Sequence, residues 1–105
     1  MKTSKFCTEM IARHAELEME KLNKMQEFVN DKLGGAEISQ GKFDALVSYA
    51  YRLATRSIEG VDKAKALIEQ VKSNPTGNFA AIFVEGATGN DVRWSKEEVS
   101  LFENH

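Results

Sequence analysis

The chain has 105 residues, of which 42% are hydrophobic and 29% are charged, proportions that are typical of an ordinary globular domain and exclude a disordered chain. Fourteen basic residues against sixteen acidic ones give a net charge of −2, which excludes a general attraction to nucleic acid or anionic lipid. With a single cysteine, Cys7, and no apolar run long enough to cross a bilayer, the sequence predicts one cytoplasmic domain over 1–105.

The first repeating pattern predicts a helix over about 5–33. Apolar residues such as Ile11, Leu22 and Val29 recur there at spacings built from three and four, which is the period of an amphipathic helix. Gly34 and the glycine after it end the pattern, because glycine accepts the left-handed conformation that closes a helix. The link to the next pattern is short, so the two helices should be antiparallel neighbours.

The second pattern predicts a helix over about 39–73, with Ser39 as its N-cap. Its apolar lines keep their phase through Gly60, so we expect one helix that continues through that glycine, and a kink near it is compatible with the pattern. The competing interpretation is a break between Ser57 and Gly60, because glycine costs a helix about 1 kcal/mol relative to alanine. Asn74 and the proline after it end the helix.

The segment 79–84, FAAIFV, has two interpretations. Its aromatic and β-branched residues favour an extended segment, which would pair with 91–94 in a β-hairpin over 79–94 and make the fold α+β. Its paired alanines favour a short helix instead. We expect an extended or irregular segment and keep the short helix as the alternative.

The clearest local signal lies close to the C-terminal end of the sequence. Ser95-Lys96-Glu97-Glu98 fits a capping box, with Ser95 as N-cap and Glu98 reaching back to it. This motif predicts a small helix over about 96–103.

The predicted fold is therefore mainly α. It is a long antiparallel helical hairpin with a short extended or irregular segment and a small C-terminal helix, and α+β is its alternative. Two helices of this length cannot cover their own wide apolar stripes. We therefore predict a homo-oligomer, most simply a dimer with a four-helix core.

Pairing the two long helices sets the carboxylate of Glu18 opposite a stretch of small side chains on the second helix. Those small residues are Ala50, Ala54, Ser57, Gly60 and Ala64. One interpretation is a close helix crossing, with Glu18 paired to an arginine at its edge. The other is a polar pocket for a small, nucleotide-like anion. The candidate pocket residues are His14, Glu18, Arg52, Arg56, Ser57 and Gly60.

Tyrosines and arginines also cluster on the second helix. Such a cluster can stack on single-stranded nucleic acid, but no basic groove accompanies it, so a protein partner is the better interpretation. The candidate partner interface consists of Tyr49, Tyr51, Arg52, Trp94, Val99 and Phe102.

The sequence gives little support for a metal site or for a catalytic nucleophile. Cys7, His14 and Glu18 share one helix face, but the close cysteine or histidine pairs of a zinc site are missing. The segment 86–90 contains two glycines but lacks the lysine of a phosphate-binding loop. Cys7 has no evident base beyond His14, because the other histidine is His105. We expect no catalytic residues, no metal, no cofactor and no enzyme activity.

Three functions remain, in order of preference. The first is a small cytoplasmic protein-interaction module, acting as an adaptor, inhibitor or accessory subunit. The second is a binder of a small ligand or nucleotide-like anion, between the long helices or between subunits. The third is a nucleic-acid-associated regulator, which would need a basic surface assembled by oligomerisation. No membrane association is expected.

Overall fold

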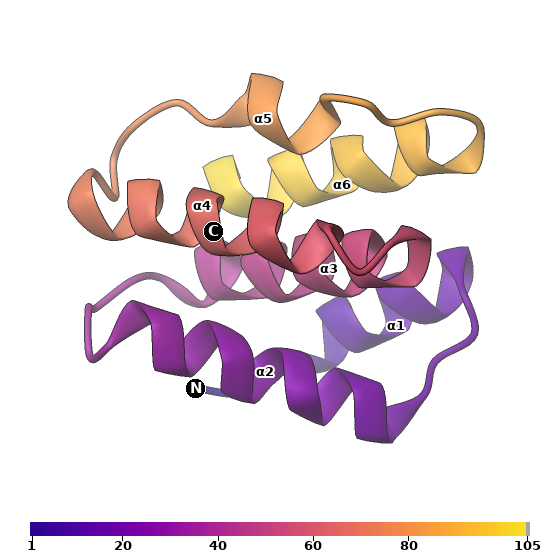
Figure 1. Cartoon of the computed structure of the whole chain (residues 1–105), viewed down its shortest axis with the longest axis horizontal. Coiled ribbons are helices and arrows are strands. Elements are labelled where there is room, and N and C mark those ends of the chain that lie inside the picture. The colour runs from indigo at the N-terminus through magenta and orange to yellow at the C-terminus, as the bar shows by residue number, and fades with distance from the viewer. Residues whose placement is uncertain (105) are drawn as a thin grey trace.

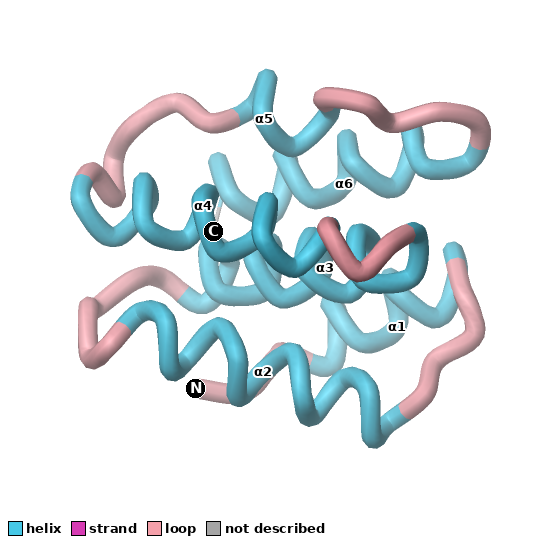
Figure 2. The backbone as a smooth tube through the Cα atoms, viewed as in Figure 1, coloured by secondary structure: helices cyan, strands magenta, loops and turns pink. Residues whose placement is uncertain are grey.

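Six helices make up the fold in the computed structural model, which describes residues 1–104 and contains no strand among them (Figure 1 and Figure 2). The helices are α1 (Lys5–His14), α2 (Met19–Leu33), α3 (Gln40–Arg56), α4 (Gly60–Ser73), α5 (Ala80–Val84) and α6 (Asn90–Asn104). The bundle measures 30 × 27 × 26 Å. A mainly α fold is thus confirmed, whereas the long hairpin and the β-hairpin over 79–94 are wrong. His105 lies outside the described residues.

The helix predicted over 5–33 is broken between α1 and α2, where residues 15–18 leave the helical path. The side chain of Tyr51 in α3 stabilises the chain at this break. Its hydroxyl donates to the carbonyl of Glu16 at 2.8 Å and accepts from the backbone N–H of Glu18 at 3.0 Å. Because the phenol satisfies backbone groups that a continuous helix would have paired internally, the chain can reverse there. A repeating apolar pattern does not reveal such a tertiary contact.

The helix predicted over 39–73 is also broken, and the competing interpretation, a break between Ser57 and Gly60, is confirmed. Ser57 is extended, and its hydroxyl accepts a hydrogen bond from the N–H of Glu59 at 3.0 Å. A Cβ on Gly60 would lie 2.4 Å from the carbonyl oxygen of Leu53, so only glycine lets α4 fold back this tightly. Ile58, inside this turn, is 93% exposed.

The segment 79–84 is mostly helical, so the extended segment predicted there is wrong. The side chain of Asn78 accepts a hydrogen bond from the N–H of Ala80 at 3.1 Å, and α5 follows for one turn. Phe83 is buried and packs against the ring of Phe102 on α6. The apolar run is thus a short helix with one side in the core.

Helix α6 begins at Asn90, several residues before the predicted start. Ser95 and Glu98 lie inside the helix and are fully buried, so the predicted capping box is wrong. The hydroxyl of Ser95 donates to the carbonyl of Val92 at 2.8 Å. The carboxylate of Glu98 points into the core, where it finds partners on α3.

Helix α3 lies at the centre of the bundle. Figure 1 shows it between α1 and α2 on one side and α5 and α6 on the other, and it packs against α1, α2, α4 and α6. Its residues from Phe43 to Arg52 are all buried. None of the helices within residues 1–104 combines the length and the apolar character that a membrane crossing requires.

We expect Gly60→Ala to destabilise the fold. The clash with the Leu53 carbonyl must shift backbone, which costs about 1–3 kcal/mol and outweighs the gain of about 1 kcal/mol in helix propensity. Urea unfolding followed by circular dichroism measures the difference. Lys65→Ala, at an exposed position of the same helix, is the control and should stay within about 0.5 kcal/mol of the wild type. A stabilised Gly60→Ala protein would contradict the tight turn.

Candidate functional site

A buried ion pair joins three helices. Arg52 of α3 and Glu98 of α6 are each at most 1% exposed. The Nη2 of Arg52 donates to Oε1 of Glu98 at 2.8 Å, and its Nε lies 3.2 Å from Oε2. The same Nη2 donates to the carbonyl of Phe83 in α5 at 2.7 Å. One guanidinium therefore fixes the positions of α5 and α6 relative to α3.

A serine and a tryptophan extend this pair into a buried network. The hydroxyl of Ser48 donates to Oε2 of Glu98 at 2.8 Å, and Nε1 of Trp94 donates to that hydroxyl at 2.9 Å. Burial raises the pKa of Glu98 to about 7, although the hydrogen bond and charge of Arg52 act in the opposite direction.

A second ion pair lies near the surface, one helical turn further along α3. Arg56 donates from Nε to Asp91 at 2.8 Å, and its Nη2 makes a second, parallel hydrogen bond to the same carboxylate. The hydrogen bond from Arg56 lowers the pKa of Asp91. The Arg56 side chain is 55% exposed, so this pair contributes little to stability.

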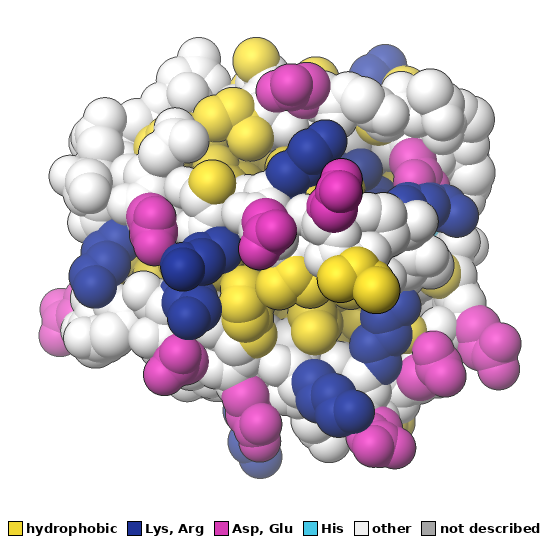
Figure 3. Space-filling view, viewed as in Figure 1, with side chains coloured by type: hydrophobic (Ala, Val, Ile, Leu, Met, Phe, Trp, Pro, Cys, Tyr) yellow, Lys and Arg dark blue, Asp and Glu magenta, His cyan; other side chains and the backbone are white. Residues whose placement is uncertain are grey.

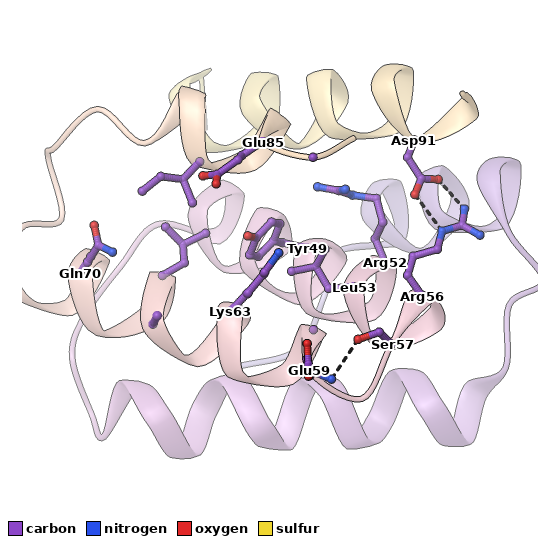
Figure 4. Close-up of a pocket in the computed structure, with 15 residues that line it drawn as sticks. Tyr49, Arg52, Leu53, Arg56, Ser57, Glu59, Lys63, Gln70, Glu85 and Asp91 are labelled. Atoms are coloured by element: carbon purple, nitrogen blue, oxygen red, sulfur yellow. Dashed lines mark hydrogen bonds and ion pairs between the residues drawn. The ribbon is translucent and has the colours of Figure 1, made fainter. Parts of the chain in front are cut away.

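These arginines form one side of a cleft of about 390 Å³ between α3 and α4 and the α5–α6 segment (Figure 4). Its apolar lining comes from Leu53, Ala66, Leu67 and Ile82. Its polar lining comes from Tyr49, Arg52, Arg56, Ser57, Glu59, Lys63, Gln70, Glu85 and Asp91. The cleft thus combines a small aliphatic surface with a larger set of polar groups, so it is more polar than the usual ligand site.

Two donor atoms on largely buried side chains face this cleft without a protein partner. Tyr49 is 4% exposed and Arg52 is 1% exposed, yet neither the Tyr49 hydroxyl nor Nη1 of Arg52 bonds any residue within 1–104. Every fully enclosed side-chain nitrogen or oxygen in that range has a partner, so both atoms must reach the cleft surface. Burial raises the pKa of Tyr49, which keeps its phenol protonated and able to donate.

The rim of the cleft carries further charges. Lys63 of α4 and the carboxylates of Glu59 and Glu85 line it, and Figure 4 shows Lys63 and Glu85 on opposite walls. None of these three forms an ion pair with another residue of the range 1–104. With Arg52 held by Glu98 and Arg56 held by Asp91, Lys63 is the cation of the cleft without an acidic partner in that range.

The structure brings together four of the six candidate pocket residues, since Arg52, Arg56, Ser57 and Gly60 all line the cleft. His14 lies elsewhere, stacked on Trp94 at a centroid distance of 5.4 Å and hydrogen-bonded to Glu97 at 2.9 Å. Glu18 is exposed at the start of α2. Glu18 therefore does not form a pocket with the small residues of the second predicted helix. The cleft opens on another side of α3 and α4.

Most of the candidate partner interface belongs to the interior. Tyr49, Tyr51, Arg52, Trp94 and Phe102 are buried, and Val99 is half-buried. The surface expected around Tyr51 and Arg52 is therefore not exposed to a partner. Cys7 is buried too, and its thiol donates to the carbonyl of Asp44 at 3.4 Å. Residues 1–104 contain no group of three potential ligands placed to hold a metal ion.

Sequence reasoning missed Ser48, Lys63, Glu85 and Glu98 as members of this region. Glu98 lies 46 positions from Arg52, and the local motif around it matched a helix cap. An available signal was its spacing from Trp94 and Leu101, at four and three residues, which places Glu98 on the apolar face of α6.

We expect Arg52→Met to destabilise the fold by about 3–5 kcal/mol near pH 8, because it leaves a buried carboxylate without its cation. Without Arg52 the folded-state pKa of Glu98 rises further, so the loss of stability relative to the wild type should grow as pH rises above about 7, the pKa of Glu98 with Arg52 in place. Urea unfolding at several pH values measures this. Arg56→Met, on the exposed pair, is the matched control and should cost about 1 kcal/mol or less. Equal effects of both substitutions would contradict the central role of Arg52.

Comparison of this chain with protein-family models, curated proteins and solved structures finds no match in any of the three.

Proposed function

We propose that the protein binds a small organic anion in the cleft and does not catalyse a reaction. The observation that carries the proposal is the pair of unpartnered donors, the Tyr49 hydroxyl and Nη1 of Arg52, on the cleft wall. Both atoms reach the cleft surface, where they can donate to water or to a ligand, and the carboxylate of a bound ligand would accept a charge-assisted hydrogen bond from Arg52. Lys63 adds a positive charge nearby.

The other lining groups narrow the ligand to a monoanion with an aliphatic body. Glu59, Glu85 and Asp91 also line the cleft, and their negative charges disfavour a multiply charged phosphate. The side chains of Leu53, Leu67 and Ile82 offer an apolar surface to the rest of the molecule. The proposal is a form of the second function inferred from the sequence, a binder of a small ligand. It differs in the ligand, which is an organic carboxylate in place of a nucleotide-like anion.

The cleft supports binding better than catalysis. Its serine, Ser57, accepts a hydrogen bond from the backbone of Glu59, and no histidine lines the cleft among the described residues. His14 lies on another part of the surface and is stacked on Trp94. A nucleophile without an adjacent base is a weak one.

Hexanoate serves as the test probe, because it joins one carboxylate to an aliphatic chain. We expect Tyr49→Phe to weaken hexanoate binding about 3- to 12-fold, the loss of one hydrogen bond. We expect Lys63→Gln to weaken it as well, while Lys65→Gln, two residues away and outside the cleft, should not. Isothermal titration calorimetry measures the affinities. Hexylamine is the matched cationic probe, and tighter binding of hexylamine than of hexanoate would contradict an anion site.

A homodimer remains our second proposal, as the form of a protein-interaction module. The sequence predicted a dimer because two long helices would leave their apolar stripes uncovered. That reason no longer holds, because the shorter helices of the broken hairpin cover these stripes within one chain. A different observation favours it: Figure 3 shows hydrophobic side chains gathered between α4 and α2, and Ile58 is 93% exposed. The same view shows Lys and Arg interspersed with Asp and Glu, which gives no support to a nucleic-acid regulator.

Light scattering tests the dimer. We expect a dimer at micromolar concentration, and Ile58→Asp should convert it to a monomer by placing a charge in the apolar contact. Val92→Asp, at another exposed apolar position on α6, is the control and should leave the dimer intact. A wild-type monomer under these conditions would contradict the proposal.

A further inference from the structure

Arg52 belongs to two sites at once. Its Nε and Nη2 hold Glu98 in the core, while Nη1 is free of protein partners and reaches the cleft. The guanidinium is planar and delocalises a single positive charge over these three nitrogens. Any anion at Nη1 therefore shares that charge with the buried carboxylate of Glu98.

Two anions that share one buried cation repel each other. The interior around Glu98 excludes water, so this repulsion is poorly screened compared with that at the surface. A proton on Glu98 removes this repulsion, and the hydroxyl of Ser48 would then turn to accept the new O–H in place of donating to Oε2. Binding of an anion in the cleft must then favour the protonated form of Glu98.

The other groups around Glu98 do not supply a second cation. From α3 it meets the hydroxyl of Ser48 and the guanidinium of Arg52. From its own helix the charge of Asp91 acts on it, and from α1 the neighbouring titratable group is the thiol of Cys7. Helix α5 contributes the Phe83 carbonyl, which occupies Nη2 of Arg52. Asp91 is negative and favours protonation of Glu98 further.

From this arrangement we propose that the cleft takes up its carboxylate together with a proton, which is held on Glu98. The inference rests on the proposed function, because it requires an anion at Arg52. It adds a regulation that the proposed function does not contain, since affinity for the ligand becomes dependent on pH. Burial already brings the pKa of Glu98 to about 7, so the dependence falls near neutral pH.

Trp94 provides a direct readout of this proton. It is the one tryptophan of the chain, and its indole N–H donates to Ser48, which in turn donates to Glu98. The ¹H–¹⁵N signal of that indole should therefore follow the protonation of Glu98. His14 stacks on Trp94, so the measurement is repeated in the His14→Gln protein to separate the contribution of the imidazole from that of Glu98.

The experiment titrates the full-length protein with hexanoate between about pH 6 and about pH 8.5, a range in which the probe stays ionised. We expect the affinity to fall with rising pH, approaching tenfold per pH unit above the midpoint of the Trp94 signal. Saturating hexanoate should move that midpoint to higher pH, and hexylamine should not. Calorimetry in two buffers of different ionisation enthalpy should show proton uptake on binding.

Glu98→Gln is the decisive variant, because its side chain imitates the neutral carboxyl. It should bind hexanoate with an affinity independent of pH and close to that of the wild type at low pH. Hexanoate binding by the wild type with no proton uptake, an unmoved midpoint and constant affinity would overturn the linkage and leave the anion site standing. An absence of hexanoate binding at every pH would overturn both.

Discussion

The fold depends on one buried ion pair, Arg52 with Glu98. Transfer of Arg52 and Glu98 out of water costs several kcal/mol for each ion, and only close, multiple hydrogen bonds offset such a cost. These hydrogen bonds come from residues of three helices. Helices α3, α5 and α6 must therefore be in place together before the cost of burying the ion pair is offset. A purely apolar core would tolerate small shifts between these helices, whereas this network requires defined positions.

Local signals predicted the helical class and the outer ends of the two long helical segments, but long-range contacts decided where the chain reverses within them. The apolar period continues through residues 15–18 and through Gly60, so it could not show that Tyr51 pairs with the backbone at the first break or that α4 folds back at the second. The break at Ser57 was foreseeable as an alternative, because glycine weakens a helix there. The break before Glu18 has no comparable residue signal.

The candidate site, like the fold, could be predicted only where its residues are close in sequence. Arg52, Arg56, Ser57 and Gly60 are close in sequence, and all four line the cleft. His14 and Glu18 were added on the assumption of two straight helices, and the reversal at residues 15–18 removes that geometry. The remaining members come from α4 and the α5–α6 segment, whose placement against α3 follows from tertiary packing.

The separation of Arg52 and Glu98 along the chain also bears on how the protein forms during synthesis. The guanidinium is made long before its carboxylate partner, since Glu98 follows Arg52 by 46 positions. A nascent chain that ends before α6 can form individual helices, but burial of Arg52 would leave its charge uncompensated. The partly made chain should therefore keep this side of α3 hydrated, and the compact state should appear only when the final helix has emerged from the ribosome.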